Sequence, residues 1–262
     1  RELEKMLDAG EEVPSDLVMI QCVGSREPER PYCSRVCCTK AVTNAVRLRE
    51  RFPEMRVYVL YREMRTYGFR EDFYHQARQE GVAFLRYELP HKPQVTADDD
   101  GGALTIRLRE PVTGETVELK AGTLVLSTGI EPNDASDLAD TLDISLDKNG
   151  FFQEEYPKMR PLDFVKRGVF MCGLAHSPRF SDETILQAQG AAMRAAAVLQ
   201  QQALTAPVPA VQVNELLCTA CGQCVEVCPY GARVLEPGAH TAEVIEVLCQ
   251  GCGACIVACP NK

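Results

Sequence analysis

Two cysteine runs of identical spacing lie one after the other near the C-terminal end of the chain, and they constrain its fold more than any other feature. The first run reads CTACGQCVEVCP, with Cys218, Cys221, Cys224 and Cys228 before Pro229. The second run reads CQGCGACIVACP, with Cys249, Cys252, Cys255 and Cys259 before Pro260. Both follow the pattern C-x2-C-x2-C-x3-C-P, so this part of the chain is a duplicated unit built around thiol ligands.

This doubled pattern predicts two [4Fe–4S] clusters, because it is the cysteine spacing of bacterial ferredoxins, in which the fourth cysteine of each run binds the other cluster. The predicted ligands of the first cluster are Cys218, Cys221, Cys224 and Cys259. The predicted ligands of the second cluster are Cys249, Cys252, Cys255 and Cys228. Structural zinc and disulfide bonds fit this pattern less well, since zinc sites use separated cysteine pairs and disulfides require no doubled period.

Composition narrows the class of protein and its surroundings. A length of 262 residues allows about two domains, and a formal net charge of −9 argues against nucleic acid as a partner, which would require a basic surface. No apolar run approaches the roughly 20 residues that span a bilayer, and the N-terminal RELEKMLDAG has neither a signal-peptide pattern nor an initiator Met. Twelve of the thirteen cysteines fall into groups suited to clusters, which indicates a reducing compartment. We therefore expect a cytoplasmic chain without a transmembrane segment that is part of a longer protein.

The first half of the chain alternates between strand and helix patterns. Residues 1–15 are charged and are predicted to be a tail or linker. Residues 17–23, 55–62 and 82–87 are predicted strands, and residues 34–51 and 69–81 are predicted helices. In the first helix Ala41, Ala45 and Leu48 share an apolar face, and Gly81 closes the second. This alternation predicts a parallel, doubly wound α/β sheet.

The pattern changes in the second half. Residues 94–120 predict short antiparallel strands with turns at 98–102 and 113–114, and a buried strand follows at 124–127. Residues 133–168 carry no clear pattern. A further strand is predicted at 169–173 and a long alanine-rich helix at 182–203, with Ser181, Asp182 and Glu183 suited to its N-terminus. Pro207 and Pro209 then mark a linker.

A third cysteine group lies in the stretch CVGSREPERPYCSRVCC and consists of Cys22, Cys33, Cys37 and Cys38. Cys33 and Cys37 are four residues apart at the predicted helix start and so are expected to share a face, while Arg26 and Arg35 favour thiolates. The residues alone leave a cluster, buried free thiols and a redox-active vicinal pair open, because no standard spacing matches. The thirteenth cysteine, Cys172, falls in an apolar strand and is predicted to be a core residue.

With these residues, the chain resembles the C-terminal part of the family of heterodisulfide reductase A-type subunits. The matching stretches are CVGSR, PYCSRVCC, LVLSTGIEPN, the segment from GLA to QGAAMRAA, and the two ferredoxin runs. The resemblance implies a third [4Fe–4S] cluster at Cys22, Cys33, Cys37 and Cys38. It also implies an α/β, Rossmann-like fold of the thioredoxin-reductase type. The implied domains are a Rossmann-like domain with the third cysteine site over 16–127, the return segment of an FAD-binding domain over 128–205, and a ferredoxin domain with two [4Fe–4S] clusters over 206–262.

The resemblance is incomplete at the flavin site. Family members carry a G-x-G-x-x-G fingerprint in an N-terminal half, and no such motif occurs here, since GCGACI only begins like one. The resemblance places against FAD the residues Thr128, Gly129, Gly173, Leu174, Ala175, Glu183, Thr184 and Ile185. The helix N-terminus at 183–185 would offer backbone amides and its dipole to the flavin carbonyls. The alternative is that the glycines only turn the chain, and His176 is either close to the flavin or a solvated loop residue.

The resemblance implies an oxidoreductase subunit that passes electrons between a donor module, FAD and acceptor subunits of an electron-bifurcating complex. The implied partners are a hydrogenase or formate dehydrogenase module, heterodisulfide reductase B- and C-like subunits, ferredoxin, and an N-terminal flavin-binding half. No acid–base residue is indicated. Two other hypotheses stay open: a non-catalytic iron–sulfur wiring subunit without flavin, and the related quinone-interacting oxidoreductase subunit.

Overall fold

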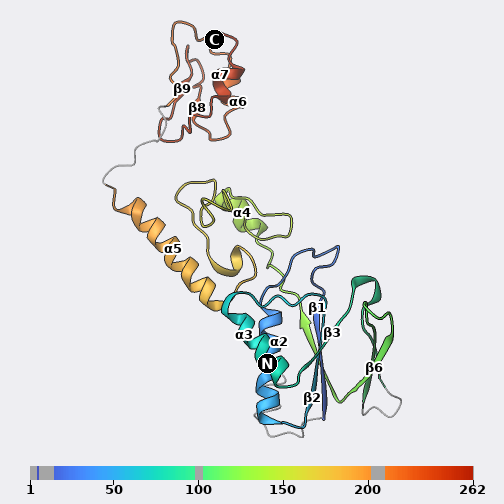
Figure 1. Ribbon diagram of the computed structural model, residues 1–262. Helices are drawn as coiled ribbons and strands as arrows, with labels where there is room; N and C mark the ends of the chain where they lie inside the picture. Colours follow the sequence, from blue (N-terminus) through green and yellow to red (C-terminus); the bar gives the residue numbers. More distant parts are fainter. Residues whose placement is uncertain (1–4, 6–14, 98–102, 202–209, 262) are drawn as a thin grey trace. The chain divides into compact units, whose positions relative to one another are not determined.

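A parallel sheet of four strands forms the centre of the N-terminal part of the chain (Figure 1). The computed structural model describes residues 5, 15–97, 103–201 and 210–261. The strand order is β3-β2-β1-β7, with β1 at Asp16–Val23, β2 at Arg56–Tyr61, β3 at Ala83–Arg86 and β7 at Thr123–Thr128. Every neighbouring pair is parallel, which confirms the predicted α/β sheet.

Three layers result because β1 is apolar on both faces. Leu17 and Met19 pack in a buried cluster with the residues of α2, whereas Val18 and Ile20 face an antiparallel sheet on the other side. That second sheet has the order β4-β5-β6, with β4 at Gln94–Ala97, β5 at Leu104–Arg109 and β6 at Thr116–Ala121. Side chains alternate between faces along a strand, so a strand covered on both sides is a continuous apolar run. The antiparallel prediction for 94–120 is confirmed, and its turn at 98–102 lies outside the described residues.

Helix α2 spans Cys37–Arg51 and buries the predicted face of Ala41, Ala45 and Leu48. It begins three residues later than the predicted start at 34, because Arg35 has a left-handed φ of 60°, which no helical residue adopts. Helix α3 spans Glu71–Gln79 after the short turn η1 at Gly68–Arg70, close to its predicted position. A second short turn, η2 at Leu89–His91, follows β3.

Residues 129–200 contain little regular structure before their long final helix. Helix α4 spans Ser136–Leu142, and η3 spans Gly173–Ala175. The predicted strand at 169–173 is wrong: this segment contributes only an isolated bridge from Phe170 to Asp163, since left-handed Gly168 and Gly173 interrupt the extended backbone on both sides. Helix α5 spans Ser181–Leu199, as the alanine-rich pattern predicts, but it ends before the predicted limit at 203: Gln200 and Gln201 are not helical, and residues 202 and 203 lie outside the described residues.

The chain divides into two compact units, Arg1–Ala195 and Ala196–Lys262. The second unit contains α6 at Gln223–Glu226, β8 at Arg233–Val234, β9 at Glu243–Val244 and α7 at Ala254–Ala258. The predicted linker with Pro207 and Pro209 lies outside the described residues, as does nearly all of the predicted tail 1–15. Within the described ranges, no helix combines the length and the apolar character needed to cross a membrane.

Candidate functional site

The two cysteine runs repeat the same backbone conformation. The residue before the second cysteine is left-handed in both, with φ of 54° at Ala220 and 64° at Gly251. The residue after the second cysteine is also left-handed, with φ of 79° at both Gly222 and Gly253. Each loop then enters a short helix, α6 or α7, that contains the third cysteine. The two loops are therefore structural repeats, in keeping with their identical spacing.

A cavity of ≈310 Å³ lies against the first loop. Its lining includes three cysteines of the first run and the last cysteine of the second, namely Cys218, Cys221, Cys224 and Cys259. Cys255 and Arg233 also reach this cavity. Four thiols around one cavity are the donor set of an iron–sulfur cluster, because soft thiolates favour iron–sulfur chemistry over hard cations.

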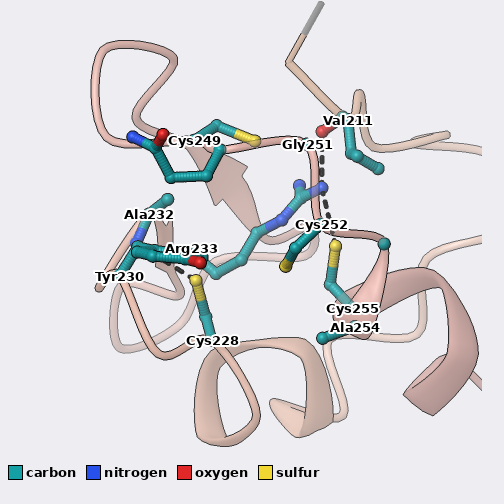
Figure 2. A pocket seen from close by; sticks show the side chains of 12 residues that line it. Val211, Cys228, Tyr230, Ala232, Arg233, Cys249, Gly251, Cys252, Ala254 and Cys255 are labelled. Atoms are coloured by element: carbon teal, nitrogen blue, oxygen red, sulfur yellow. Dashed lines mark hydrogen bonds between the residues drawn. The ribbon is translucent and has the colours of Figure 1, made fainter. Parts of the chain in front are cut away.

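A second, much smaller cavity of ≈10 Å³ lies against the other loop, and Figure 2 shows the side chains around it. Its cysteines are Cys249, Cys252 and Cys255 of the second run with Cys228 of the first. The side chain of Arg233 extends between the sulfurs of Cys228, Cys252 and Cys255 (Figure 2). In both cavities, three cysteines of one run thus meet the fourth cysteine of the other.

Backbone amides are directed at the first sulfur of each run. The amides of Ala242 and Ala220 lower the pKa of Cys218, and the amide of Val211 lowers the pKa of Cys249. Such hydrogen bonds favour the thiolate, which is the form that binds iron. In the part of the chain that the structure describes, no three His, Cys, Asp or Glu side chains are gathered around a position for a single metal ion. The thiols and amides present fit the thiolate set of a cluster.

Cys22 lies at an irregularity near the carboxyl end of β1. The register between β1 and β7 shifts between Ile20 and Val23, and Cys22 itself is left-handed, with φ of 61°. Its side chain is buried, with 5% of the residue exposed. A left-handed residue other than glycine costs on the order of 1 kcal/mol or more, and such strain is concentrated at functional sites.

The other three cysteines of this group converge on Cys22 by a route that the sequence did not predict. Cys37 and Cys38 open α2, while Cys33 lies in the preceding loop, so the expectation that Cys33 and Cys37 share a helix face is wrong. The left-handed Arg35 delays the helix and thereby separates them. The hydrogen bond with Cys38 and burial raise the pKa of Cys37, and the neighbouring Cys38, Cys22 and Cys33 thiols raise it further. The thiols of Cys22, Cys33 and Cys38 are thus all near enough to Cys37 to raise its pKa.

Positive charge surrounds this group. A hydrogen bond from Cys37 lowers the pKa of Cys38 to about 7 against the effect of burial, assisted by the Arg65 amide and by the charges of Arg26 and Arg65. Arg26 Nη2 lies 3.0 Å from Glu63 Oε2, and its Nη1 is buried without a hydrogen-bond partner among the described residues. A buried donor of this kind fits an anionic group held by the four thiolates.

Two of the residues predicted to contact flavin lie against the end of β1 and the turn after it: Thr128 ends β7, and Gly129 follows it. A Cβ at position 129 would lie 2.7 Å from Gly24 O, so only glycine fits there. The next amide, that of Ile130, donates to Ser34 Oγ at 2.9 Å. The end of β7 is thereby fastened to the loop that carries Cys33.

The remaining predicted flavin residues gather at η3 and the start of α5. A Cβ at Gly173 would lie 2.8 Å from Thr184 Cγ2, so η3 packs closely on the first turn of α5, with Leu174 exposed. The Thr184 amide donates to Phe180 O at 2.9 Å, so it already takes part in the hydrogen bonding of the helix. The amides without an acceptor inside the helix are those that precede Thr184. Ile185 is 58% exposed.

Glu183 is the centre of a polar network that sequence reasoning missed. Its carboxylate accepts hydrogen bonds from Arg35 Nη2 at 2.7 Å, from Tyr67 Oη at 2.8 Å and from the Phe180 amide at 3.0 Å. The last contact is the return bond of a capping box, with Glu183 three residues after Phe180. The contact with Arg35 joins residues 148 positions apart, and no local pattern could have indicated it.

Cys172 and His176 flank η3. Cys172 is half-buried in extended backbone. The His176 side chain is only 12% exposed and lies 3.1 Å from Glu154 Oε2 and 2.7 Å from Arg179 Nη2, so the alternative of a solvated loop histidine is wrong. Burial and the Arg179 charge lower the pKa of His176.

Comparison with known proteins agrees with this geometry. Residues 211–234 match the 4Fe-4S binding domain family. Over 84% of its length the chain is 37% identical to the second A-type iron–sulfur subunit of the CoB–CoM heterodisulfide reductase of Methanopyrus kandleri, and covers 34% of that protein. Over 85% of its length it is 36% identical to the A-type subunit of the H(2)/formate:CoB-CoM heterodisulfide,ferredoxin reductase of Methanococcus maripaludis, again covering 34%.

The chain belongs to the family of heterodisulfide reductase A-type subunits. It spans about a third of the length of these two relatives. Its fold also resembles, at a TM-score of 0.44 and 18% identity, the crystal structure of T. acidophilum thioredoxin reductase, over 70% of this chain and 51% of that chain. The parallel sheet and the 4Fe-4S match bear out the predicted fold class, and the family includes iron–sulfur proteins by name.

Proposed function

We propose that this chain is the iron–sulfur electron-transfer part of a heterodisulfide-reductase-type oxidoreductase, in which three [4Fe–4S] clusters connect FAD to partner subunits. The observation that carries the proposal is that three cysteines of one run and the fourth of the other line each of two cavities, with Cys255 reaching both. It supports one cluster at Cys218, Cys221, Cys224 and Cys259, and a second at Cys249, Cys252, Cys255 and Cys228. Such clusters accept and release single electrons.

The third cluster is proposed at Cys22, Cys33, Cys37 and Cys38. Their mutual proximity, the left-handed Cys22 and the partly unpaired Arg26 support it. In this role Arg26 and Arg65 would balance the negative charge of the thiolates. The bulge in β1 would hold Cys22 near the cysteines at the start of α2.

Flavin contact is proposed for the surface formed by Thr128, Gly129, Gly173, Leu174, Ala175, Glu183, Thr184 and Ile185. The tight packing of η3 on α5 supports a preformed surface there. Helix α5 has no buried residue, and Leu186 is 67% exposed and Met193 73% exposed. An apolar helix face of this kind is expected to be covered, and we propose that an N-terminal flavin-binding half covers it.

The domain limits and partners belong to the same proposal. The Rossmann-like part is taken as 16–127, the flavin return segment as 128–205 and the ferredoxin part as 206–262, in a cytoplasmic complex. The name of the Methanococcus relative supports H₂ or formate as electron source and ferredoxin as acceptor. In this proposal a hydrogenase or formate dehydrogenase module delivers the electrons, the flavin bifurcates them, and ferredoxin and heterodisulfide reductase B- and C-like subunits receive them. The competing function is a wiring subunit without flavin. A flavin absorption spectrum of the purified complex distinguishes the two.

The number of clusters is tested by iron and acid-labile sulfide analysis of the anaerobically purified chain. Three clusters require about twelve irons and as many sulfides per chain, whereas the two ferredoxin runs alone require about eight. Replacement of Cys22 by Ser should then lower the iron content by up to about four, and Cys172→Ser serves as the control that leaves it unchanged. An iron content near eight in the unaltered chain would remove the third cluster and leave the other two.

A further inference from the structure

Arg233 is buried between the two ferredoxin cavities and lines both of them. It opens β8, and only 4% of the residue is exposed. Its Nη2 donates to Val211 O at 2.5 Å and to Cys255 Sγ at 3.4 Å (Figure 2). Its Nη1 is buried and has no hydrogen-bond partner within the described residues. The guanidinium therefore holds a spare donor in a place that water does not reach.

The burial of this arginine is unusual for the part of the chain in which it lies. Residues 206–262 contain only two Lys or Arg residues, Arg233 and Lys262, against five glutamates. In the described part of the chain, no carboxylate lies within ion-pair distance of Arg233. A buried cation without a counter-charge costs several kcal/mol, because desolvation is not repaid by an ion pair. The anion that balances Arg233 is therefore a group other than a side-chain carboxylate.

The cysteines supply that anion. Arg233 Nη2 lies within hydrogen-bond reach of Cys255 Sγ, at 3.4 Å. Cys255 lines both cavities. A cluster with four thiolates carries net negative charge, and each one-electron reduction adds one further negative charge without a proton.

We propose that Arg233 is the shared counter-ion of the two ferredoxin clusters and raises their reduction potentials, most strongly for the cluster of Cys249, Cys252, Cys255 and Cys228. The reduced state carries the greater negative charge, so a fixed cation in a poorly solvated site stabilises it more than the oxidised state. A hydrogen bond to a cluster sulfur acts in the same direction and is one of the factors that set these potentials. The direct bond to Cys255 Sγ makes the effect largest on that side. Arg233 thus acts on the reduction potentials of the clusters without itself carrying electrons. This inference rests on the cluster assignments proposed above.

The test is an anaerobic redox titration of the full, cluster-containing chain, followed by electron paramagnetic resonance. Arg233→Met removes the charge at similar length, and Arg233→Lys keeps the charge without the planar fork. Glu243→Gln is the matched control, because it changes the charge of the same unit by one at an exposed position. At the potential that half-reduces the unaltered cluster, Arg233→Met should lower the reduced-to-oxidised ratio at least tenfold, a shift of about 59 mV for one electron. Arg233→Lys should keep most of the original potential.

Two results would overturn the inference. One is a potential in Arg233→Met that differs from the unaltered chain by no more than the potential of Glu243→Gln does. The other is failure of both Arg233 variants to assemble clusters while Glu243→Gln assembles them, which would mean that the fork is needed for packing. Assembly in Arg233→Lys but not in Arg233→Met supports a need for charge. If the unaltered chain itself lacks the two ferredoxin clusters by iron analysis, the proposed function fails instead, and the two failures are therefore distinguishable.

Discussion

At the scale of single residues, left-handed backbone marks the turns that gather the cysteines. Ala220 and Gly251 occupy equivalent positions of the two ferredoxin loops, with φ of 54° and 64°. In the third cysteine group Cys22 and Arg35 are also left-handed, with φ of 61° and 60°. Because residues other than glycine adopt this conformation only at a cost on the order of 1 kcal/mol or more, the surrounding contacts must hold them in place. The positions of the cysteines therefore depend on the residues between them as much as on their spacing.

Replacement of Cys228 by Ala tests the exchange of ligands between the runs. Cys228 follows the first run but lines the cavity of Cys249, Cys252 and Cys255, so the variant should damage that cluster and spare the other. Cys259→Ala is the mirrored variant and should damage the cluster of Cys218, Cys221 and Cys224. Electron paramagnetic resonance of the two variants should show loss of different signals, each with a loss of up to about four irons. If each variant instead resembled the replacement of a cysteine from its own run, the ligand assignment would be reversed.

The sequence predicted the ferredoxin cysteines because their ligand pattern is local: the spacing within one run determines the loop. It did not predict the burial of Arg233, because no pattern in the neighbouring sequence indicates that this side chain is buried. The third group was harder still. Its convergence depends on the bulge at Cys22 and on the left-handed Arg35, and neither has a pattern in the sequence.

At the scale of elements, the start of α5 is joined to the loop that carries the third cysteine group. Glu183 caps the helix through the Phe180 amide and also accepts from Arg35, which lies between Cys33 and Cys37. Arg35 is in turn 2.8 Å from Tyr67 Oη, so three separate segments meet at one carboxylate. Such a network fixes the helix relative to the loop more firmly than its separate hydrogen bonds would.

Replacement of Glu183 by Gln should destabilise the first unit by about 1–2 kcal/mol at neutral pH, as expected for a lost cap and charged hydrogen bonds. Burial alone would raise the pKa of Glu183, but the Phe180 amide, the Tyr67 hydroxyl and the Arg35 charge outweigh it and hold the pKa below its usual value. A lowered folded-state pKa stabilises the fold above the ordinary Glu pKa of about 4.3, and this contribution is lost as the pH falls through the folded value. Urea unfolding between about pH 7 and about pH 3 should therefore show the difference from the unaltered chain shrink in acid.

Glu54→Gln is the control for this measurement, because Glu54 is exposed. It should leave the free energy of unfolding unchanged across the same range. A Glu183→Gln difference that persists undiminished in acid would show that the charge of Glu183 is not what stabilises the start of α5.

Elements were predicted well where one pattern, either a continuous apolar run or a helical period, extended over their whole length. The strands of the parallel sheet and the alanine-rich α5 met this condition, and α2 met it from Cys37 onward. The predicted strand at 169–173 failed because its five apolar residues had no neighbouring strand to pair with apart from one bridge. Helix α4, in the segment without a pattern, is only seven residues long, too short for a clear helical period.

At the scale of the whole molecule, the exposed apolar residues of α5 are the basis for the proposal that further protein covers the first unit. Ile185, Leu186 and Met193 are all more than half exposed on a helix without a buried residue. Of the residues proposed to contact flavin, Glu183, Thr184 and Ile185 lie at the N-terminal end of this same helix, and η3 packs against its first turn. The covering segment and the flavin are therefore expected to bind together, with the covering segment supplying the part of the flavin site that this sequence lacks.

Replacement of Leu186 by Glu, in a complex that contains the flavin-binding N-terminal half, should release FAD and leave the iron–sulfur clusters in place. A charge on the covered apolar face should weaken the contact, because burying an unpaired carboxylate costs several kcal/mol, and FAD should be lost with it. The flavin absorbance per chain should fall severalfold, while the iron content should stay at its original value. Val112→Glu is the matched control, since Val112 is 84% exposed in the turn between β5 and β6, and should keep its flavin. Full flavin retention in Leu186→Glu would mean that α5 faces another partner or solvent. An unaltered complex without a flavin spectrum would instead favour the wiring subunit without flavin.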